Sequence, residues 1–393
     1  MPGFAANPGT IASFVERLRL GAGDLYLRPS GLLSASDAAS AASAGRALPL
    51  AGGGLVFTQC ELIARGRGNG RGSLLAPVEI LQAWCDGADD PVVRRARGIL
   101  GALTRPRAPF AGLPLAPGDG DGTILMGIVN VTPDSFSDGG KFFDAEAAIE
   151  QGQALLDAGA RIVDVGGEST RPGAIPVPID EELKRVLPVV RALAERGAAV
   201  SIDTRHAGVM KAAVSEGAVI VNDVTALSGE AASLEVAARS RAAVVLMHMQ
   251  GEPATMQDSP AYDDAPLDIF DFLAGRIAAC EKSGIARERI AVDPGIGFGK
   301  TKRHNAEIMR DLALFHGLGC GVMLGVSRKG FVAGAQGSLA PEKRLPGSLA
   351  AALAAVAKGV QLLRVHDVAE TRQALSVWNA VRGARAGAAP GAD

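Results

Sequence analysis

Eight short apolar runs between residues 124 and 365 limit the fold more than any other feature of this sequence. They are ILMGIV, RIVDV, AAVSI, AVIV, AAVVLM, RIAV, GVMLGV and QLLRV, and stretches of helical length such as AEAAIEQGQALLDAG lie between them. Because this spacing is too long for hairpins, the runs are expected to pair as parallel strands joined by helical crossovers. The alternation predicts an α/β fold, a closed (β/α)8 TIM barrel.

A doubly wound open sheet would also alternate strands with helices. Such a sheet usually has fewer strands, and a phosphate-binding loop follows its first strand. No G-x-G-x-x-G segment opens a helix in this chain. The barrel is therefore favoured over the open sheet.

Composition bears on the partners and the cellular location of this protein. Lys and Arg number 40 against 42 Asp and Glu, so electrostatics suggests neither nucleic acid nor an anionic membrane as a partner. The four cysteines lie far apart, which is typical of reduced, buried thiols in a cytoplasmic protein. The N-terminus lacks the pattern of a secretory signal, and no apolar stretch is long enough to cross a bilayer. We expect a cytoplasmic location.

A change in composition near residue 120 divides the chain. The segment APFAGLPLAPGDGDG is typical of a linker. We predict an N-terminal extension of unknown function over residues 1–120, a small α+β module, then the barrel over 121–383 and a disordered tail over 384–393. Within the extension, RGRGNGRG could touch RNA, but a loop is favoured because no aromatic residues are interleaved for stacking.

Polar residues follow the apolar runs at the strand ends, where a barrel of this type carries its ligand site. They are Asn130, Glu168 to Arg171, Asp203, Asn222, Asp223, His248, Asp293, Ser327 to Lys329, Arg364 and His366. Helix capping would explain some of them, such as Asp203, but capping does not call for Arg, Lys and His on one rim. We therefore expect a shared site.

The charges on this rim fall into two groups. Acceptors on three strands, Asp203, Asn222 and Asp293, suit a ligand ring rich in N–H donors, such as an aminopyrimidinone. Cationic donors suit a phosphate or carboxylate: Arg171, Lys329, Arg364 and His366. The carboxylates come without the His pairing expected of a zinc site. The pattern indicates a ligand with a donor-rich ring at one end and an anion at the other.

Eight motifs then resemble one known family. MGIVNVTPDSFSDGG, DVGGESTRPGA, SIDT, VNDVTAL, LMHMQGEPATMQ, DPGIGFGKT, GVSRKGF and RVHDVAET, in this order, resemble dihydropteroate synthase over residues 124 to about 380. The resemblance implies a transferase of folate biosynthesis, the sulfonamide target. It would join 6-hydroxymethyl-7,8-dihydropterin diphosphate to 4-aminobenzoate, giving 7,8-dihydropteroate and diphosphate.

The resemblance also implies roles for particular residues. The pterin pocket would consist of Asp203, Asn222, Asp293 and Lys329, lined by Met247, Phe298 and Gly325. The diphosphate and Mg²⁺ site would consist of Asn130 as the metal ligand with Arg364 and His366, and Thr170 close by. The 4-aminobenzoate site would consist of Thr170, Arg171, Pro172, Ser327, Lys329 and Phe136. Of these, we expect the cations Lys329, Arg364, His366 and Arg171 to be catalytic.

We expect the mechanism to be mainly electrostatic. Diphosphate can leave ahead of attack and give a resonance-stabilised pterin cation, which the buried carboxylates Asp203 and Asp293 would favour. Mg²⁺, Arg364 and His366 would neutralise the leaving group. The arylamine needs little activation, so no strong general base is assigned and positioning should dominate.

The segments VTPDSFSDGG and GESTRPGA are expected to be mobile loops that close over the site. We interpret Lys329 as functional, and Arg328 as a salt-bridge or dimer residue. His248 could be a ligand contact or a packed residue. We expect His304 and Asn305 to brace the DPGIGFGKT loop, and His206 and His316 to lie on the surface.

Two other functions stay open. A pterin-binding methyltransferase would share the barrel and the acceptor pocket but would not need a diphosphate site. A non-catalytic pterin-binding scaffold is the second. The SRK and RVHDV segments favour the synthase. The family suggests a homodimer through the last helices.

Overall fold

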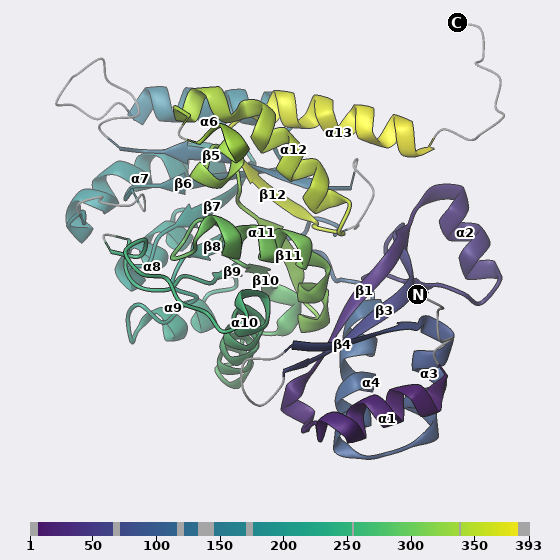
Figure 1. The fold of residues 1–393 in the computed structure, drawn as a ribbon. Helices are drawn as coiled ribbons and strands as arrows, with labels where there is room; N and C mark the ends of the chain where they lie inside the picture. The colour runs from purple at the N-terminus through teal and green to yellow at the C-terminus, as the bar shows by residue number, and fades with distance from the viewer. Residues whose placement is uncertain are drawn as a thin grey trace, which may run out of the picture.

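The computed structural model describes residues 7–65, 71–115, 122–132, 145–169, 176–253, 255–337 and 339–383. In this described part, eight parallel strands close into a barrel in the order β10-β11-β12-β5-β6-β7-β8-β9 (Figure 1). The strands are β5 (Ile124–Asn130), β6 (Ile162–Gly166), β7 (Ala199–Asp203), β8 (Ile220–Asp223), β9 (Ala243–Met247), β10 (Ile290–Asp293), β11 (Gly321–Leu324) and β12 (Leu362–Val365). The predicted (β/α)8 barrel is confirmed.

Apolar side chains fill the lower half of the barrel interior. Side chains alternate between the two faces of a strand, so every second residue points inward. One buried cluster holds inward residues from the strand starts: Ile124, Met126, Ile162, Ile220, Ala243, Val245, Ala291, Met323 and Leu362. Phe110, from the segment with the composition of a linker, is 1% exposed and packs in the same cluster. The described part of that segment, residues 108–115, therefore closes the end of the barrel where the strands begin.

Helices pack around the strands and bury a second apolar layer. They are α6 (Ala145–Asp157), α7 (Ile179–Glu195), α8 (Ala207–Ser215), α9 (Ser233–Arg239), α10 (Ala265–Lys282), α11 (Lys302–Arg310), α12 (Leu345–Val356) and α13 (Val368–Gly383), with the 3-10 segments η2 (Arg287–Arg289), η3 (Leu312–Leu318), η4 (Gly330–Gln336) and η5 (Pro341–Arg344). Local sequence sets where two of them begin. Asp264 accepts a hydrogen bond from the Leu267 amide to start α10, and Thr301 accepts one from the His304 amide to start α11.

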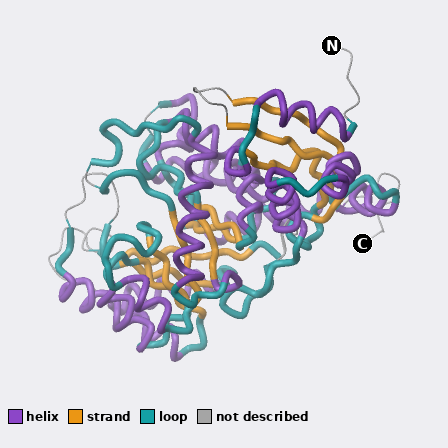
Figure 2. The backbone as a smooth tube through the Cα atoms, turned by 90° about the horizontal axis from the view of Figure 1, so that it is seen from below, coloured by secondary structure: helices purple, strands orange, loops and turns teal. Residues whose placement is uncertain are grey.

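The N-terminal residues build a second unit with its own core. Its sheet is antiparallel, with β3 (Val56–Arg65) pairing β1 (Leu25–Leu33), β2 (Leu48–Pro49) and β4 (Arg71–Pro77). Its helical segments are α1 (Pro8–Leu18), η1 (Ala22–Asp24), α2 (Ala35–Ser43), α3 (Val78–Gly87) and α4 (Pro91–Thr104). Figure 2 shows this sheet as a group of strands beside those of the barrel. We call this unit, residues 8–104, the N-terminal module.

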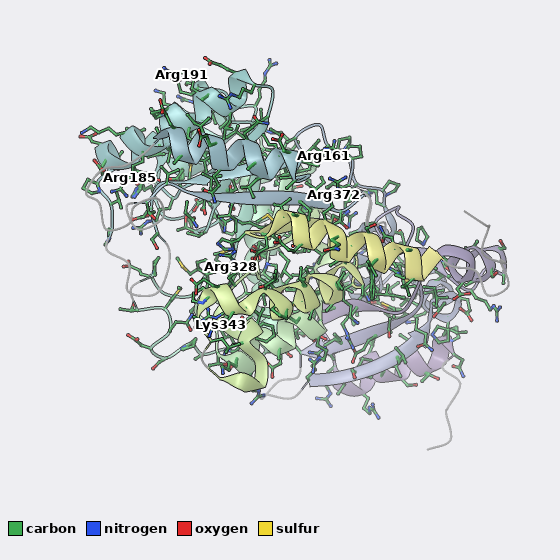
Figure 3. The ribbon with its side chains drawn as sticks, turned by 90° about the horizontal axis from the view of Figure 1, so that it is seen from above. Arg161, Arg185, Arg191, Arg328, Lys343 and Arg372 are labelled. Atoms are coloured by element: carbon green, nitrogen blue, oxygen red, sulfur yellow. The ribbon has the colours of Figure 1, made fainter. Side chains whose placement is uncertain are left out.

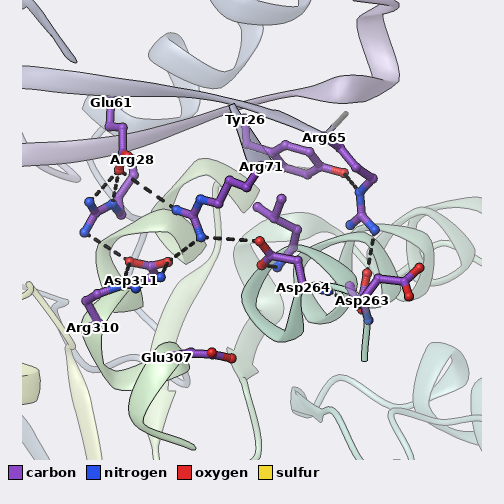
Figure 4. Close-up of polar contacts among 12 residues, drawn as sticks. Tyr26, Arg28, Glu61, Arg65, Arg71, Asp263, Asp264, Glu307, Arg310 and Asp311 are labelled. Atoms are coloured by element: carbon purple, nitrogen blue, oxygen red, sulfur yellow. Dashed lines mark hydrogen bonds and ion pairs between the residues drawn. The ribbon is translucent and has the colours of Figure 1, made fainter. Parts of the chain in front are cut away.

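One face of the module sheet lies against the barrel's outer helices (Figure 4). The apolar side chains of Leu25 and Leu27 belong to the module's own core, while Tyr26 between them packs edge-on against Phe270 of α10 with ring centroids 5.6 Å apart. Strand alternation thus gives this sheet two different faces: one packs under the module's helices, and the other docks on the barrel.

Ion pairs hold this interface. Asp311, which is fully buried, lies 3.1 Å from Arg28 and 3.0 Å from Arg71. Arg65 lies 2.5 Å from Asp268 and 3.1 Å from Asp271, both on α10. The module therefore rests on the start of α10 and on the turn between α11 and η3.

All four cysteines are free and buried, as expected. His316 is fully buried beneath the module, with Nε2 3.1 Å from the Lys358 carbonyl, so its assignment to the surface was wrong. His206 is partly buried and pairs with Glu230 at 2.6 Å. No helix within the described ranges is long and apolar enough to cross a membrane. The predicted tail lies outside the described residues.

Candidate active site

The barrel interior changes from apolar to polar between one inward position and the next. On β6, β8, β10 and β12, each apolar inward residue is followed two positions later by a polar one: Ile162 by Asp164, Ile220 by Asn222, Ala291 by Asp293 and Leu362 by Arg364. Asp203 ends β7 in the same register as Asn222 and Gly166. The barrel interior is therefore apolar where the strands begin and polar two residues later, towards their carboxyl ends. We call this polar end the mouth of the barrel.

Arg364 crosses this mouth. Its Nε lies 2.6 Å from Asp164 Oδ2 on β6, and its Nη2 lies 2.6 Å from Asp203 Oδ2 on β7. Strand β12 is separated from β7 by β5 and β6, so these side chains can meet only across the interior. Asn222 Nδ2 donates to the same Asp164 oxygen at 3.1 Å. Four strand-end groups thus form one hydrogen-bonded network.

Burial and charge act against each other in this network. Burial raises the pKa of the Asp203 carboxyl above its ordinary value, and Arg364 opposes that rise. Burial lowers the pKa of the Arg364 guanidinium, but Asp164 and Asp203 outweigh burial and raise it. The guanidinium therefore stays charged, and it compensates two carboxylates that would otherwise be costly to bury.

A second group faces this network. Asp293 at the end of β10 accepts a 2.7 Å hydrogen bond from the Gly295 amide, and burial raises its pKa while Lys329 opposes the rise. A Cβ atom at Gly325 would lie 3.5 Å from Asp293 Oδ2 and 3.8 Å from Arg364 Cβ, so Gly325 lies between the two groups. The acceptors and the cations therefore share one mouth.

Lys329 lies on the loop side of the mouth. Its Nζ donates to the Ile296 carbonyl at 2.6 Å and sits 4.4 Å from the centre of the Phe298 ring. Burial lowers the pKa of Lys329 to about 8, and Asp293 limits the fall. A ring or an anion that enters the mouth would therefore contact the Lys329 amine. Because its pKa is lowered, Lys329 loses its charge at a lower pH than Arg364 does.

Ser327 and His366 lie next to each other at the ends of β11 and β12. The Ser327 hydroxyl accepts a 3.2 Å hydrogen bond from the His366 amide and lies 3.0 Å from His366 Nδ1. Arg328, labelled in Figure 3, pairs with Asp367, which fits the expected salt bridge. Met247 is buried at the end of β9.

The donor set at the mouth can be tested against a metal ion. Among the residues that the structure describes, no group of three or more His, Cys, Asp and Glu side chains could hold one. Asn130 ends β5 and offers a single amide oxygen at the rim. Mg²⁺ commonly takes few protein ligands and completes its shell with substrate phosphates and water. These residues fit a metal that arrives with a phosphorylated ligand, not a metal held by a protein cage.

Four predicted site residues, Phe136, Thr170, Arg171 and Pro172, lie outside the described residues, as do most residues of the two loops expected to close over the site. The described base of the second loop is anchored. Arg185, labelled in Figure 3, donates to the Gly167 carbonyl at 3.0 Å, and Arg205 pairs with Glu168 through two hydrogen bonds of 3.0 and 3.1 Å.

Sequence reasoning missed Asp164 and Lys300. Asp164 interrupts the apolar run RIVDV, and a charge inside a buried strand was the available signal. Lys300 is 3% exposed, and nothing in the letters GFGKT separates it from a solvated loop lysine. His304 and Asn305 do brace the loop before them, because the Thr301 amide donates to His304 and the Gly297 amide donates to Asn305.

The comparison with family models decides the family. The model described as pterin binding enzyme matches residues 126–366, which contain every strand of the barrel except the first two residues of β5. This chain belongs to the pterin-binding enzyme family.

Individual members of the pterin-binding family match closely. The dihydropteroate synthase of Escherichia coli K12 is 46% identical over 262 residues, 66% of this chain and 92% of that protein. A solved structure of the Xanthomonas albilineans dihydropteroate synthase with 4-aminobenzoic acid has 46% identity and a TM-score of 0.63, covering 68% of this chain and 95% of that one. The same enzyme with 7,8-dihydropteroate has 43% identity and a TM-score of 0.61, with 68% and 96% covered. About a third of this chain therefore lies outside these pterin-binding relatives.

Proposed function

We propose that the mouth of the barrel condenses 6-hydroxymethyl-7,8-dihydropterin diphosphate with 4-aminobenzoate. The chain is a dihydropteroate synthase and acts in folate biosynthesis. The bond between the pterin methylene carbon and the diphosphate oxygen breaks, and a bond forms from that carbon to the arylamine nitrogen, which gives up a proton to water. The observation that carries the assignment is the meeting of Asp203, Asp293, Lys329 and Arg364 at one mouth.

The acceptor half of the mouth suits the ring. Asp203, Asn222 and Asp293 would receive the N–H groups of the pterin, with Met247, Phe298 and Gly325 lining its faces. Because their surroundings are buried, these hydrogen bonds would be strong, and the carboxylates would favour positive charge on the ring as diphosphate leaves.

The cationic half suits the leaving group. Arg364 and His366 would stabilise the charge that develops on diphosphate, and Lys329 would contact both the ring and 4-aminobenzoate beside Ser327. A bound Mg²⁺ would supply a Lewis acid for the diphosphate, with Asn130 as its protein ligand. Thr170, Arg171, Pro172 and Phe136 would complete the aminobenzoate site from the two loops.

The test is formation of dihydropteroate by the full chain, with and without Mg²⁺, repeated for Arg364→Ala. We expect wild-type turnover that depends on Mg²⁺, and a loss of roughly 10²- to 10³-fold in kcat for the variant, the size measured when a transition-state donor is removed. A urea denaturation curve for each protein separates lost chemistry from lost folding.

Two outcomes would favour the other functions. Pterin binding without turnover would indicate a scaffold, and methyl transfer from a methylated folate to a corrinoid would indicate the methyltransferase. A normal rate in Arg364→Ala would remove the assignment of the anion site.

We also propose a homodimer. Val377 and Val381 on α13 are 61% and 69% exposed and lie four residues apart, on one face of the helix. Association of two copies through this helix face would cover these two apolar side chains. Light scattering of the purified chain measures the mass, and a monomer at micromolar concentration would contradict this proposal.

A further inference from the structure

The loop that follows β10, residues 294–301, is held by side chains along its whole length. Four consecutive carbonyls each accept a hydrogen bond from a side chain: Ile296 from Lys329 at 2.6 Å, Gly297 from Gln257 at 2.6 Å, Phe298 from Lys300 at 2.9 Å and Gly299 from Tyr262 at 2.8 Å. This segment carries Phe298, one of the residues expected to line the pterin pocket.

The backbone of this loop explains why side chains are needed. Gly295, Gly297 and Gly299 all have positive φ, at 70°, 83° and 61°, so the segment cannot continue as a strand or a helix. Its carbonyls therefore lack regular backbone partners. A buried carbonyl without a partner costs free energy comparable to a lost hydrogen bond, and the donors to the partly buried carbonyls of Ile296, Phe298 and Gly299 reduce that cost.

Lys300 makes the most connections. Its buried Nζ lies 2.9 Å from His248 Nδ1, 3.1 Å from the His248 carbonyl and 2.9 Å from the Phe298 carbonyl. Burial lowers the pKa of the Lys300 amine well below its ordinary value, and three polar atoms surround this amine at hydrogen-bond distance. Lys300 thus ties the residue that follows β9 to the loop that follows β10.

Two further donors, Gln257 and Tyr262, come from the segment between β9 and α10. Tyr262 lies two residues before Asp264, the residue that caps α10, and its ring packs edge-on against His304 with centroids 4.9 Å apart. Gln257 is exposed and reaches the Gly297 carbonyl from outside. The buried Lys300 therefore holds the loop on its interior side, and Gln257 and Tyr262 hold it from the segment before α10.

We propose that Gln257, Tyr262 and Lys300 are positioning residues for the pterin ring. They fix the loop before substrate arrives, so Phe298 stands 4.4 Å from the Lys329 ammonium and the ring meets a formed surface. Holding a binding surface in its bound shape lowers the entropy lost on binding. This inference rests on the proposed function, because it names the pterin as the ligand of that surface.

Tyr262→Phe tests the proposal, because it removes one hydroxyl and leaves the ring. We expect KM for the pterin diphosphate to rise about threefold to tenfold, the range for one lost hydrogen bond, with KM for 4-aminobenzoate unchanged. Binding of 6-hydroxymethylpterin, measured by calorimetry, should weaken by the same factor. Lys300→Met removes an amine that has three polar partners, so we expect a larger loss of pterin binding.

Tyr26→Phe is the matched control. Tyr26 also donates its hydroxyl at 2.7 Å, to Asp271, but it lies at the module interface, away from the loop. Tyr262→Phe loses one partly buried hydrogen bond, and Tyr26→Phe loses two, because the Tyr26 hydroxyl also accepts from Arg65 Nε at 3.3 Å. A purely structural role would therefore lower the urea midpoint in both variants and change neither KM. We expect the pterin KM to rise in Tyr262→Phe alone.

The outcomes are distinguishable. An unchanged pterin KM in Tyr262→Phe, or an equal rise for both substrates, would overturn the inference while an active wild type still supports the function. A wild type that neither binds the pterin nor forms dihydropteroate would overturn the function, and the inference with it.

Discussion

Lys329 is a residue of this mouth whose charge should change at mildly alkaline pH. Burial lowers its pKa to about 8, and Lys loses its charge above its pKa, so the cation is present below pH 8 and disappears as pH rises through that value. Because kcat/KM reports ionisation in the free enzyme, we expect kcat/KM for the pterin diphosphate to fall above about pH 8. Initial rates at low substrate concentration from pH 6 to 10 measure this.

Lys329→Arg should remove that fall, because a guanidinium stays charged throughout this range, although the rate itself should drop. Lys343, an exposed lysine labelled in Figure 3, provides the control, since Lys343→Arg should keep the wild-type profile. A fall at the same pH in Lys329→Arg would assign the titration to another group.

At the scale of an element, the loop after β10 depends on glycine for its close approach to β9. Gly295 has φ of 70°, and a Cβ atom there would lie 2.0 Å from the His248 carbonyl oxygen. We expect Gly295→Ala to lower stability by about 1–3 kcal/mol, because the residue is strained and the two loops must separate. Pterin binding should weaken as well. Urea denaturation and calorimetry measure the two effects.

Gly275→Ala should change the free energy of unfolding in the opposite direction from Gly295→Ala. Gly275 is exposed inside α10, and nothing lies within 4 Å of an added Cβ. Alanine there should raise stability by about 0.5–1 kcal/mol and leave pterin binding unchanged. Two glycine variants with the same effect would contradict the strain argument.

At the scale of the whole molecule, Asp311 joins the module to the barrel (Figure 4). It is fully buried, while its partners Arg28 and Arg71 are about one-fifth exposed. We expect Asp311→Asn to lower stability by roughly 2–4 kcal/mol, somewhat less than for a wholly buried pair, because water partly screens the arginines. Urea denaturation measures this, with Asp89→Asn as the control. Asp89 pairs with Arg94 on the surface, so its loss should matter little.

The same carboxylate should make the interface sensitive to acid. Burial alone would raise the pKa of Asp311, but Arg310, Arg28 and Arg71 lower it below its ordinary value. The unfolded chain then binds the proton first as pH falls. The stabilisation is complete above about pH 4, the ordinary pKa of Asp, and is lost as pH drops towards the folded pKa. Asp311→Asn should flatten this part of the curve of stability against pH.

The strands and most of the mouth could be predicted from the sequence, for a local reason. A parallel strand covered by helices is apolar along its length, so eight such runs indicated the barrel, and the polar residue that ends each run must lie at the same rim. Asp203, Asn222, Asp293 and Arg364 followed from that rule. In the module, β1 was not predicted, because its sequence, LYLRPSGLL, includes Pro and Gly, which weaken a strand pattern.

The contacts across the barrel could not be predicted, because they join residues about 160 to 200 positions apart. Only the closed barrel brings Arg364 to Asp164 and Asp203, and only the folded loops surround the Lys300 amine with three polar partners. The docking of Arg28 and Arg71 on Asp311 depends likewise on where the module meets α11. Sequence alone set which residues could face the mouth, since period and strand ends are local. Tertiary structure decided which of them pair, since pairing depends on distances that the chain order does not contain.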